Sequence, residues 1–189
     1  MAYTNERFAP ELLMHRDELV RRVRASVDEQ QDRIAELGPA DALPRMIYET
    51  EVERVSFLLR SYLRSRILKI QSQALFLARD QNAQARLSEP EKTFAGQYAA
   101  LYQRHVDREA WQLGDTSRLP DDLKQITRVQ QLATPPNLDS HVFCVATRDC
   151  DPFRIEGSTE MVDLKRGQVA LLPYAPLRPL IEQGDVLLA

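Results

Sequence analysis

Glycine is scarce in this chain of 189 residues, and the few that it has are scattered. No two of the six glycines lie within three positions of each other. A loop that binds nucleotide phosphates needs clustered glycines, because its backbone amides must approach the phosphate closely. We therefore expect neither a common nucleotide-binding fold nor a cofactor.

Three further shortages exclude other classes of protein. Two cysteines, Cys144 and Cys150, are far too few for a small disulfide-stapled scaffold, which indicates a reducing compartment. No apolar run approaches the roughly 20 residues that cross a bilayer, and residues 1–10 lack a signal-peptide pattern, so we expect an intracellular protein without membrane contact. The net charge of -3 excludes a basic field over the whole molecule that would hold nucleic acid.

Apolar residues, at 43% of the chain, are abundant enough for a buried core, and in the first two thirds they recur at helical spacing. Between Pro10 and Leu37, apolar side chains return every seven residues, at Leu13, Val20, Val27 and Ile34. This period predicts a helix over 10–37 that packs against another helix.

A second and longer helix is predicted over about 44–80. It carries one apolar stripe from Val52 to Tyr62 and a displaced second stripe from Leu63 to Ala74, which indicates two packing partners. Its length of about 50 Å exceeds that of most helices in one compact domain and suits a rod that braces an assembly. Further helices are predicted over 88–112, with Ser88 and Glu91 as a capping box, and over 120–132.

The pattern changes at the two prolines of residues 134–139, which we interpret as a linker. Short β-like runs follow, separated by Gly, Pro or Asp, at 141–147, 153–156, 159–164, 168–172 and 185–188. The predicted fold class is α+β, with an all-α helical bundle domain over 1–133 and a small β-rich domain over 140–189. A module of about 50 residues is marginally stable alone, so we expect it to dock on its own helices or on a neighbour.

Residues typical of catalysis or metal binding are isolated from one another. His15, His105 and His141 have no ligand-like spacing to other histidines or to the cysteines, which we interpret as free thiols. Glu49 and Glu53 share a helix face, but Arg60 and Arg64 follow on that face, which is typical of a solvated or interface surface. We therefore expect no enzymatic activity.

A basic stretch stands out within this acidic chain. Between Arg45 and Arg79, seven basic residues face three acidic ones, a local excess of four positive charges. The cluster from Arg60 to Lys69 suits either a phosphate backbone, with Tyr62 between the cations, or the acidic surface of a protein partner. Two apolar stripes on the same helix favour protein contact.

The segment from Glu51 to Ile70, EVERVSFLLRSYLRSRILKI, resembles the hallmark helix of the Sld-five-type subunit of GINS, a four-subunit eukaryotic replication complex. Other parts of the chain resemble the same family in the same order, namely 8–13, Leu87-Ser88 with 94–102, Leu119-Pro120, 136–143, and 164–172 through 178–181 to Gly184-Asp185 as the C-terminal strands. Two features depart from the family pattern. Only about seven residues precede Phe8, where relatives often carry a longer acidic extension, and the turn from Asp149 to Phe153 matches no family motif.

The resemblance implies a non-enzymatic structural subunit of a heterotetramer that acts in the nucleus. Its partners would be three sister GINS subunits, the MCM helicase ring, the Cdc-forty-five-type protein and the replicative polymerase, with DNA contacted only indirectly through the complex. The alternative is a helical protein that binds nucleic acid directly through the stretch from Arg60 to Lys69. The residues that we expect at the partner interface are Leu13, Val20, Val27, Arg60, Tyr62, Leu63, Arg64, Arg66, Ile67 and Ile70.

Overall fold

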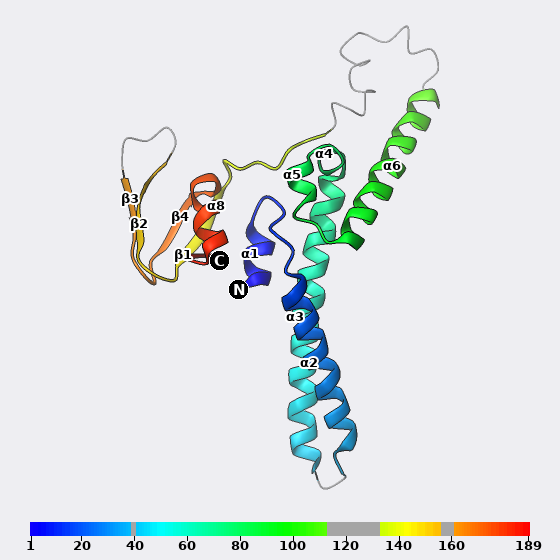
Figure 1. Cartoon of the computed structure of the whole chain (residues 1–189), viewed down its shortest axis with the longest axis vertical. Coiled ribbons are helices and arrows are strands. Elements are labelled where there is room, and N and C mark those ends of the chain that lie inside the picture. Colours follow the sequence, from blue (N-terminus) through cyan, green and yellow to red (C-terminus); the bar gives the residue numbers. More distant parts are fainter. Residues whose placement is uncertain (39–40, 113–132, 156–160) are drawn as a thin grey trace.

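A pair of long helices lies side by side, a further long helix diverges from one end of the pair, and a small β-module lies to the other side (Figure 1). The computed structural model describes residues 1–38, 41–112, 133–155 and 161–189. The helices are α1 (Ala2–Phe8), α2 (Asp17–Glu36), α3 (Ala42–Ser72), α4 (Ala74–Leu77), α5 (Gln81–Gln84), α6 (Glu89–Gln112) and α8 (Tyr174–Gln183). The strands are β1 (His141–Ala146), β2 (Cys150–Arg154), β3 (Met161–Leu164), β4 (Val169–Pro173) and β5 (Val186–Leu188).

Helix α2 packs along the N-terminal two thirds of α3, as the seven-residue period predicts. Its apolar positions Val20, Val23, Val27 and Ile34 are half-buried, and the charged positions between them are exposed. Asp17 and Glu18 occupy its first turn, where the positive end of the helix dipole favours acidic side chains.

The predicted start of this helix at Pro10 is wrong, because α2 begins at Asp17. Residues 9–16 are not helical, and a separate short helix, α1, precedes them. The backbone carbonyls of residues 10–13 accept hydrogen bonds from side chains elsewhere in the chain, so this segment satisfies its backbone without helical bonds.

The helix predicted over 44–80 ends earlier, at Ser72. Two single-turn helices, α4 and α5, follow it, and α4 buries Ala74 and Leu77. Asp80 then caps α5, because its carboxylate accepts hydrogen bonds from the amides of Asn82 and Ala83. Helix α6 runs where 88–112 was predicted, and the Ser88 amide donates to the Glu91 carboxylate, as in one half of a capping box. The helix predicted over 120–132 lies outside the described residues.

The β-module contains an antiparallel sheet in the order β4-β1-β5 and an antiparallel pair, β2-β3. Each of the five predicted runs overlaps one strand. The segment 178–181, expected among the C-terminal strands, instead lies in α8, which covers the sheet with Tyr174, Leu177 and Ile181. Pro176 sits in the first turn of α8, where backbone amides have no partner inside the helix, so this proline does not prevent the helix.

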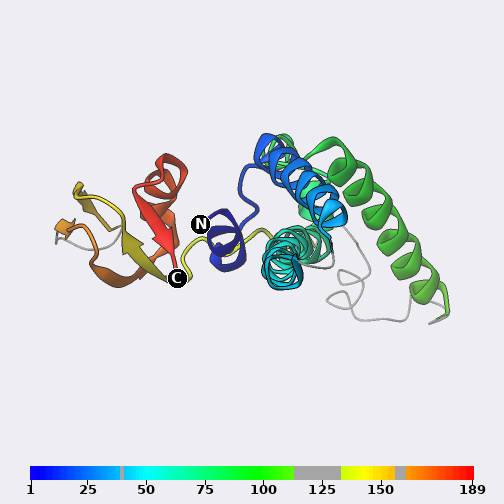
Figure 2. The same cartoon turned by 90° about the horizontal axis from the view of Figure 1, so that it is seen from below.

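The N-terminal segment joins the two parts of the molecule. Ala9 is buried and Leu13 half-buried against the core of the β-module, whereas Leu12 is buried in the helical core with Ile70 and Leu77. Helix α1 lies between the β-module and α3 in both views (Figures 1 and 2). The β-module thus docks on its own chain through residues 2–16.

The described residues bear on the predictions about the cysteines, metal binding and membrane spans. Cys144 and Cys150 are free, buried thiols, and burial raises the pKa of both. The described residues bring together no group of three or more His, Cys, Asp or Glu side chains that suits a metal ion. Among the helices whose residues are described, none combines the length and apolar character of a membrane span.

Candidate functional site

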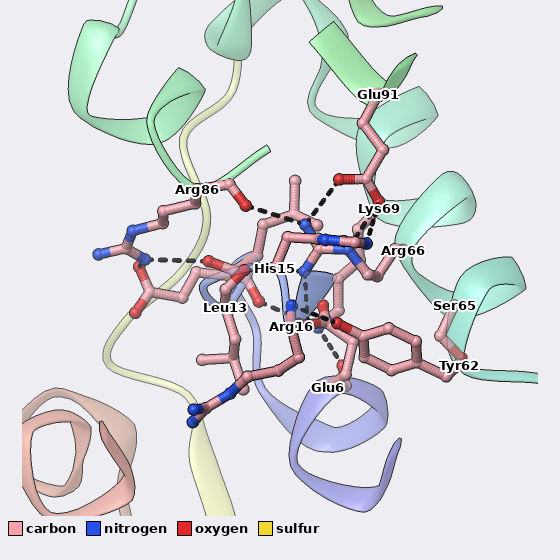
Figure 3. Close-up of polar contacts among 12 residues, drawn as sticks. Glu6, Leu13, His15, Arg16, Tyr62, Ser65, Arg66, Lys69, Arg86 and Glu91 are labelled. Atoms are coloured by element: carbon pink, nitrogen blue, oxygen red, sulfur yellow. Dashed lines mark hydrogen bonds and ion pairs between the residues drawn. The ribbon is translucent and has the colours of Figure 1, made fainter. Parts of the chain in front are cut away.

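Arg66 lies at the centre of a buried polar network beneath the predicted interface (Figure 3). Its side chain is 0% exposed. Nε and Nη2 donate to the two carboxylate oxygens of Glu91, at 2.7 and 2.9 Å. Nη1 donates to Glu6 and to the carbonyl of Leu13, at 2.9 and 2.8 Å, and Nη2 also donates to the carbonyl of Arg86 at 3.0 Å. A guanidinium has five N–H donors, so none is left for a phosphate or a partner protein.

The charges of this network stabilise one another. Burial by itself would lower the pKa of Arg66, but hydrogen bonding to Glu91 and the negative charge of Glu6 outweigh it and leave the pKa raised. Burial would likewise raise the pKa of Glu91, yet hydrogen bonds from Arg66 and the Ser88 amide leave it lowered. The pair is therefore fully ionised at neutral pH.

Lys69 is the second cation that turns inward. Its ammonium group donates to the Glu6 carboxylate at 3.1 Å, to the Glu6 carbonyl, and to the Glu11 carbonyl at 2.9 Å. Burial lowers the pKa of Lys69, and the charge of Glu6 partly opposes this effect. All three ammonium donors therefore have partners within the chain.

The carbonyls of residues 10–13 explain how these cations hold the N-terminal segment. They accept, in chain order, from Gln73, Lys69, Arg86 and Arg66 at distances of 2.8 to 3.1 Å. Three of the four donors lie on α3 or immediately after it. The polar side chains at the C-terminal end of α3 thus position the segment that carries the β-module.

Glu11 connects the helical part of the molecule to the β-module. Its buried carboxylate accepts a hydrogen bond from Arg86 after α5, one from the Tyr174 hydroxyl at 2.9 Å, and an ion pair from Arg178 Nε at 2.9 Å. Burial, together with the Glu11 charge, raises the pKa of Tyr174 well above its ordinary value. One carboxylate therefore bridges the α5–α6 connection and α8.

The predicted interface residues fall into three groups in this structure. Those that are buried within the chain are Tyr62, Arg66 and Ile70, those that are half-buried are Leu13, Val20, Val27 and Leu63, and those that are exposed are Arg60, Arg64 and Ile67. Segments 6–16 and 86–91 of the same chain cover the side chains of the buried group, and the contact of these ten residues with a partner stays a prediction. The hypothesis of direct nucleic-acid binding loses two of its four cations, Arg66 and Lys69, for the same reason.

An exposed apolar surface on α3 was missed by the sequence reasoning. We call it the α3 outer face, and it consists of Leu43, Met46, Ile47, Phe57, Leu58 and Leu68. Phe57 is 61% exposed and Leu68 is 59% exposed. At about 100° per residue these six positions fall within an arc of roughly 120°, so a helical projection was the signal that would have found them. The half-buried residues Val55 and Leu59 project from the opposite side.

Figure 2 looks along the long helices and shows α2 and α1 on two sides of α3, with another side that no described element covers. Two large side chains on α6, Leu101 and Tyr102, are exposed as well. Exposed apolar side chains spread over a helix face are typical of surfaces that another protein covers.

Two protein-family models match the chain. The model described as the GINS complex protein helical bundle domain matches residues 18–108, and the model described as the C-terminus of DNA replication complex GINS protein SLD5 matches residues 136–188.

Individual relatives match along nearly the whole chain. DNA replication complex GINS protein SLD5 from Arabidopsis thaliana is 30% identical over 195 residues, which cover 98% of this chain and 86% of the relative. The protein of that name from Schizosaccharomyces pombe is 30% identical over 190 residues, covering 97% and 86%. The Homo sapiens protein is 27% identical over 195 residues, covering 98% and 84%.

Proposed function

Because this chain belongs to the SLD5 family of GINS DNA replication proteins, we propose that it is a non-enzymatic structural subunit of a four-subunit GINS complex. Its direct partners in this proposal are three sister GINS subunits. Membership in the family supports the sister subunits as partners. The residues that the structure describes contain no metal-binding group of His, Cys, Asp or Glu side chains on which we would base an enzymatic reaction.

We further propose that the complex acts in the nucleus with the MCM helicase ring, the Cdc-forty-five-type protein and the replicative polymerase. In this proposal DNA is contacted only through the complex. Arg66 and Lys69 are bound inside the fold, which leaves Arg60 and Arg64 as the exposed cations between Arg60 and Lys69 and supports an indirect role. Two phosphate contacts would give only weak binding at physiological salt.

The observation that carries the proposal is the α3 outer face. Its six large apolar side chains lie within 26 residues, about 38 Å of helix. A core of ordinary size would cover such residues, and within the described part of the chain nothing does. We propose that sister subunits bury this face together with Leu101 and Tyr102.

Co-expression tests the proposal directly. The chain is produced with the three other subunits, purified through a tag on one sister subunit, and its stoichiometry is measured by native mass spectrometry. We expect one complex with the four chains in equal ratio. Phe57→Glu is expected to reduce co-purification at least about tenfold, because it places a charge in the buried interface.

Met161→Glu is the matched control, since Met161 is a similarly exposed apolar residue on the β-module. It is expected to leave co-purification unchanged. Failure of the unmodified chain to enter a complex with the three sister subunits would refute the proposal. An equal loss of co-purification in both variants would show that the interface does not lie on the α3 outer face.

A further inference from the structure

Four charged residues border one flank of the α3 outer face, and their order along the helix is regular. Glu49 and Glu53 come first, and Arg60 and Arg64 follow. All four side chains are exposed. At about 100° per residue they project within an arc of roughly 60° on the same flank. This flank is therefore acidic in its N-terminal half and basic in its C-terminal half.

These charges are not neutralised by ion pairs inside the described part of the chain. Glu49, Glu53 and Arg64 form none there, and the Nε of Arg60 donates only to the carbonyl of Ser56, at 3.2 Å. Arg54, by contrast, projects within the arc of the outer face itself, and it pairs at 2.7 Å with Glu51 at the other edge of that arc. The unpaired flank is available to a partner of complementary charge.

The charges on this flank indicate whether a second helix docks parallel or antiparallel to α3. In a parallel pair of helices, a given flank faces the opposite flank of its neighbour, whereas in an antiparallel pair of identical helices like flanks face each other. An antiparallel second copy of α3 would bring an acidic half against a basic half at both ends. The charge order is thus complementary to itself in the antiparallel arrangement.

The spacing fits this arrangement as well. If two copies cross between residues 56 and 57, Glu49 lies opposite Arg64 of the second copy, and Glu53 lies opposite Arg60. Within each pair the two residues are equally far from the crossing point, and the two-fold symmetry repeats both pairs on the other side. Four intermolecular ion pairs therefore form in one register.

The apolar residues match in the same register. Phe57 and Leu58 lie at the crossing point, where they meet their own counterparts. Met46 of one copy lies opposite Ile67 of the other copy. Leu68 of that other copy follows Ile67 and lies within one helical turn of Met46. Between these apolar contacts lie the small residues Thr50 and Ser61, together with Arg54, whose charge is paired with Glu51 of its own chain.

We infer that two copies of this chain pair through their α3 outer faces, antiparallel and centred between residues 56 and 57, when sister subunits are absent. Charge complementarity and apolar register select the same arrangement, which is why we commit to a second copy as the occupant. The inference concerns the chain alone and does not depend on the proposed function.

Sedimentation velocity on the full chain, over a range of concentrations, tests this pairing. The unmodified chain is expected to form a dimer in a reversible, concentration-dependent manner. Arg60→Glu with Arg64→Glu, or Glu49→Arg with Glu53→Arg, places like charges opposite each other, and each pair of substitutions is expected to weaken the dimer about tenfold or more. An equimolar mixture of these two variants restores all four ion pairs and is expected to form a heterodimer. The variant with all four substitutions is expected to dimerise like the unmodified chain.

Arg104→Glu with Arg108→Glu is the matched control, because these exposed arginines on α6 have the same spacing and change the net charge equally. It is expected to leave the dimer intact. Far-UV circular dichroism checks that every variant is folded. A monomer at all concentrations would overturn the inference, as would a dimer that tolerates both charge reversals or a mixture that fails to pair. Co-expression with the sister subunits is scored separately, so loss of the homodimer alone would leave the proposed function standing.

Discussion

The two ends of α3 invert the usual relation between residue type and exposure. Its C-terminal third carries Arg66 and Lys69, and both cations point into the protein, where they meet carboxylates and carbonyls. Its N-terminal half carries Leu43, Ile47 and Phe57, and these apolar side chains are exposed. A buried cation is tolerated only when its donors are satisfied, and an apolar stripe stays exposed when its cover is another molecule. One helix is therefore a structural anchor at one end, and along the rest it exposes the face that we propose as a docking surface.

Removing the central cation should have the largest effect on stability. Arg66→Leu leaves the Glu6 carboxylate buried without its main partner, which typically costs about 3–5 kcal/mol. Arg64→Leu, two residues away and exposed, is the control and is expected to change the free energy of unfolding by no more than about 0.5 kcal/mol. Urea denaturation measures both. Similar values for the two variants would show that the buried network is not what anchors α3.

Glu91 should contribute less than Arg66 to the free energy of unfolding, and its contribution should depend on pH. Its pKa in the folded protein is lowered below the ordinary 4.5, so the unfolded chain takes up this proton at higher pH than the folded protein does. The contribution of Glu91 is complete above about pH 4.5 and is lost as the pH falls through the lowered pKa. Glu91→Gln is expected to cost about 1.5–3 kcal/mol at pH 7 and to flatten this part of the stability profile. Glu89→Gln, at an exposed position two residues earlier, is the control. It should neither lower the stability at pH 7 nor change its dependence on pH.

The connection to the β-module should depend on the Tyr174 hydroxyl. Tyr174→Phe removes a donor from the buried Glu11 carboxylate, which keeps Arg86 and Arg178, so the expected cost is about 1–2 kcal/mol. Hydrogen exchange should report faster opening of α8 and β5 than of α3. The exposed Tyr102 supplies the control, since Tyr102→Phe is expected to leave exchange unchanged. Uniform acceleration across the whole chain would contradict a local role.

The outer face should contribute least to the stability of the single chain. Phe57→Ser is expected to change the free energy of unfolding by no more than about 0.5 kcal/mol, measured at a concentration where the chain is monomeric. Ile70→Ala, on the buried side of the same helix, should cost about 2–5 kcal/mol. A large loss in Phe57→Ser under these conditions would mean that the face is covered within the chain.

Much of the fold was predictable, because periodicity in the sequence reflects which faces are buried. The seven-residue period of Val20, Val27 and Ile34 predicts the α2–α3 pair, and Ser88 predicts the start of α6. The short β-like runs that lie between turn residues predict the approximate positions of the five described strands. Helix α8 was not predicted, because Pro176 and Pro179 imitate turn signals and the apolar face of this helix forms only against the sheet.

The candidate site was only partly predictable. The basic stretch on α3 is visible in the sequence, but the partners of Arg66 are not, since Glu6 is 60 residues away and Glu91 is 25 residues away. No local pattern pairs residues over such distances. The outer face, in contrast, could have been found, since its six residues share one side of a helix.

Local chemistry was enough to establish that this chain forms long amphipathic helices followed by short strands, and the order of its segments was enough to indicate its family. Those properties depend on neighbours within a few turns, which the sequence displays. Which charges of α3 are buried and which apolar residues stay exposed depended on residues 6–16, which lie between the helices and the β-module. Burial is set by contacts between distant segments, so only the folded chain decides whether an arginine anchors the protein or faces a partner.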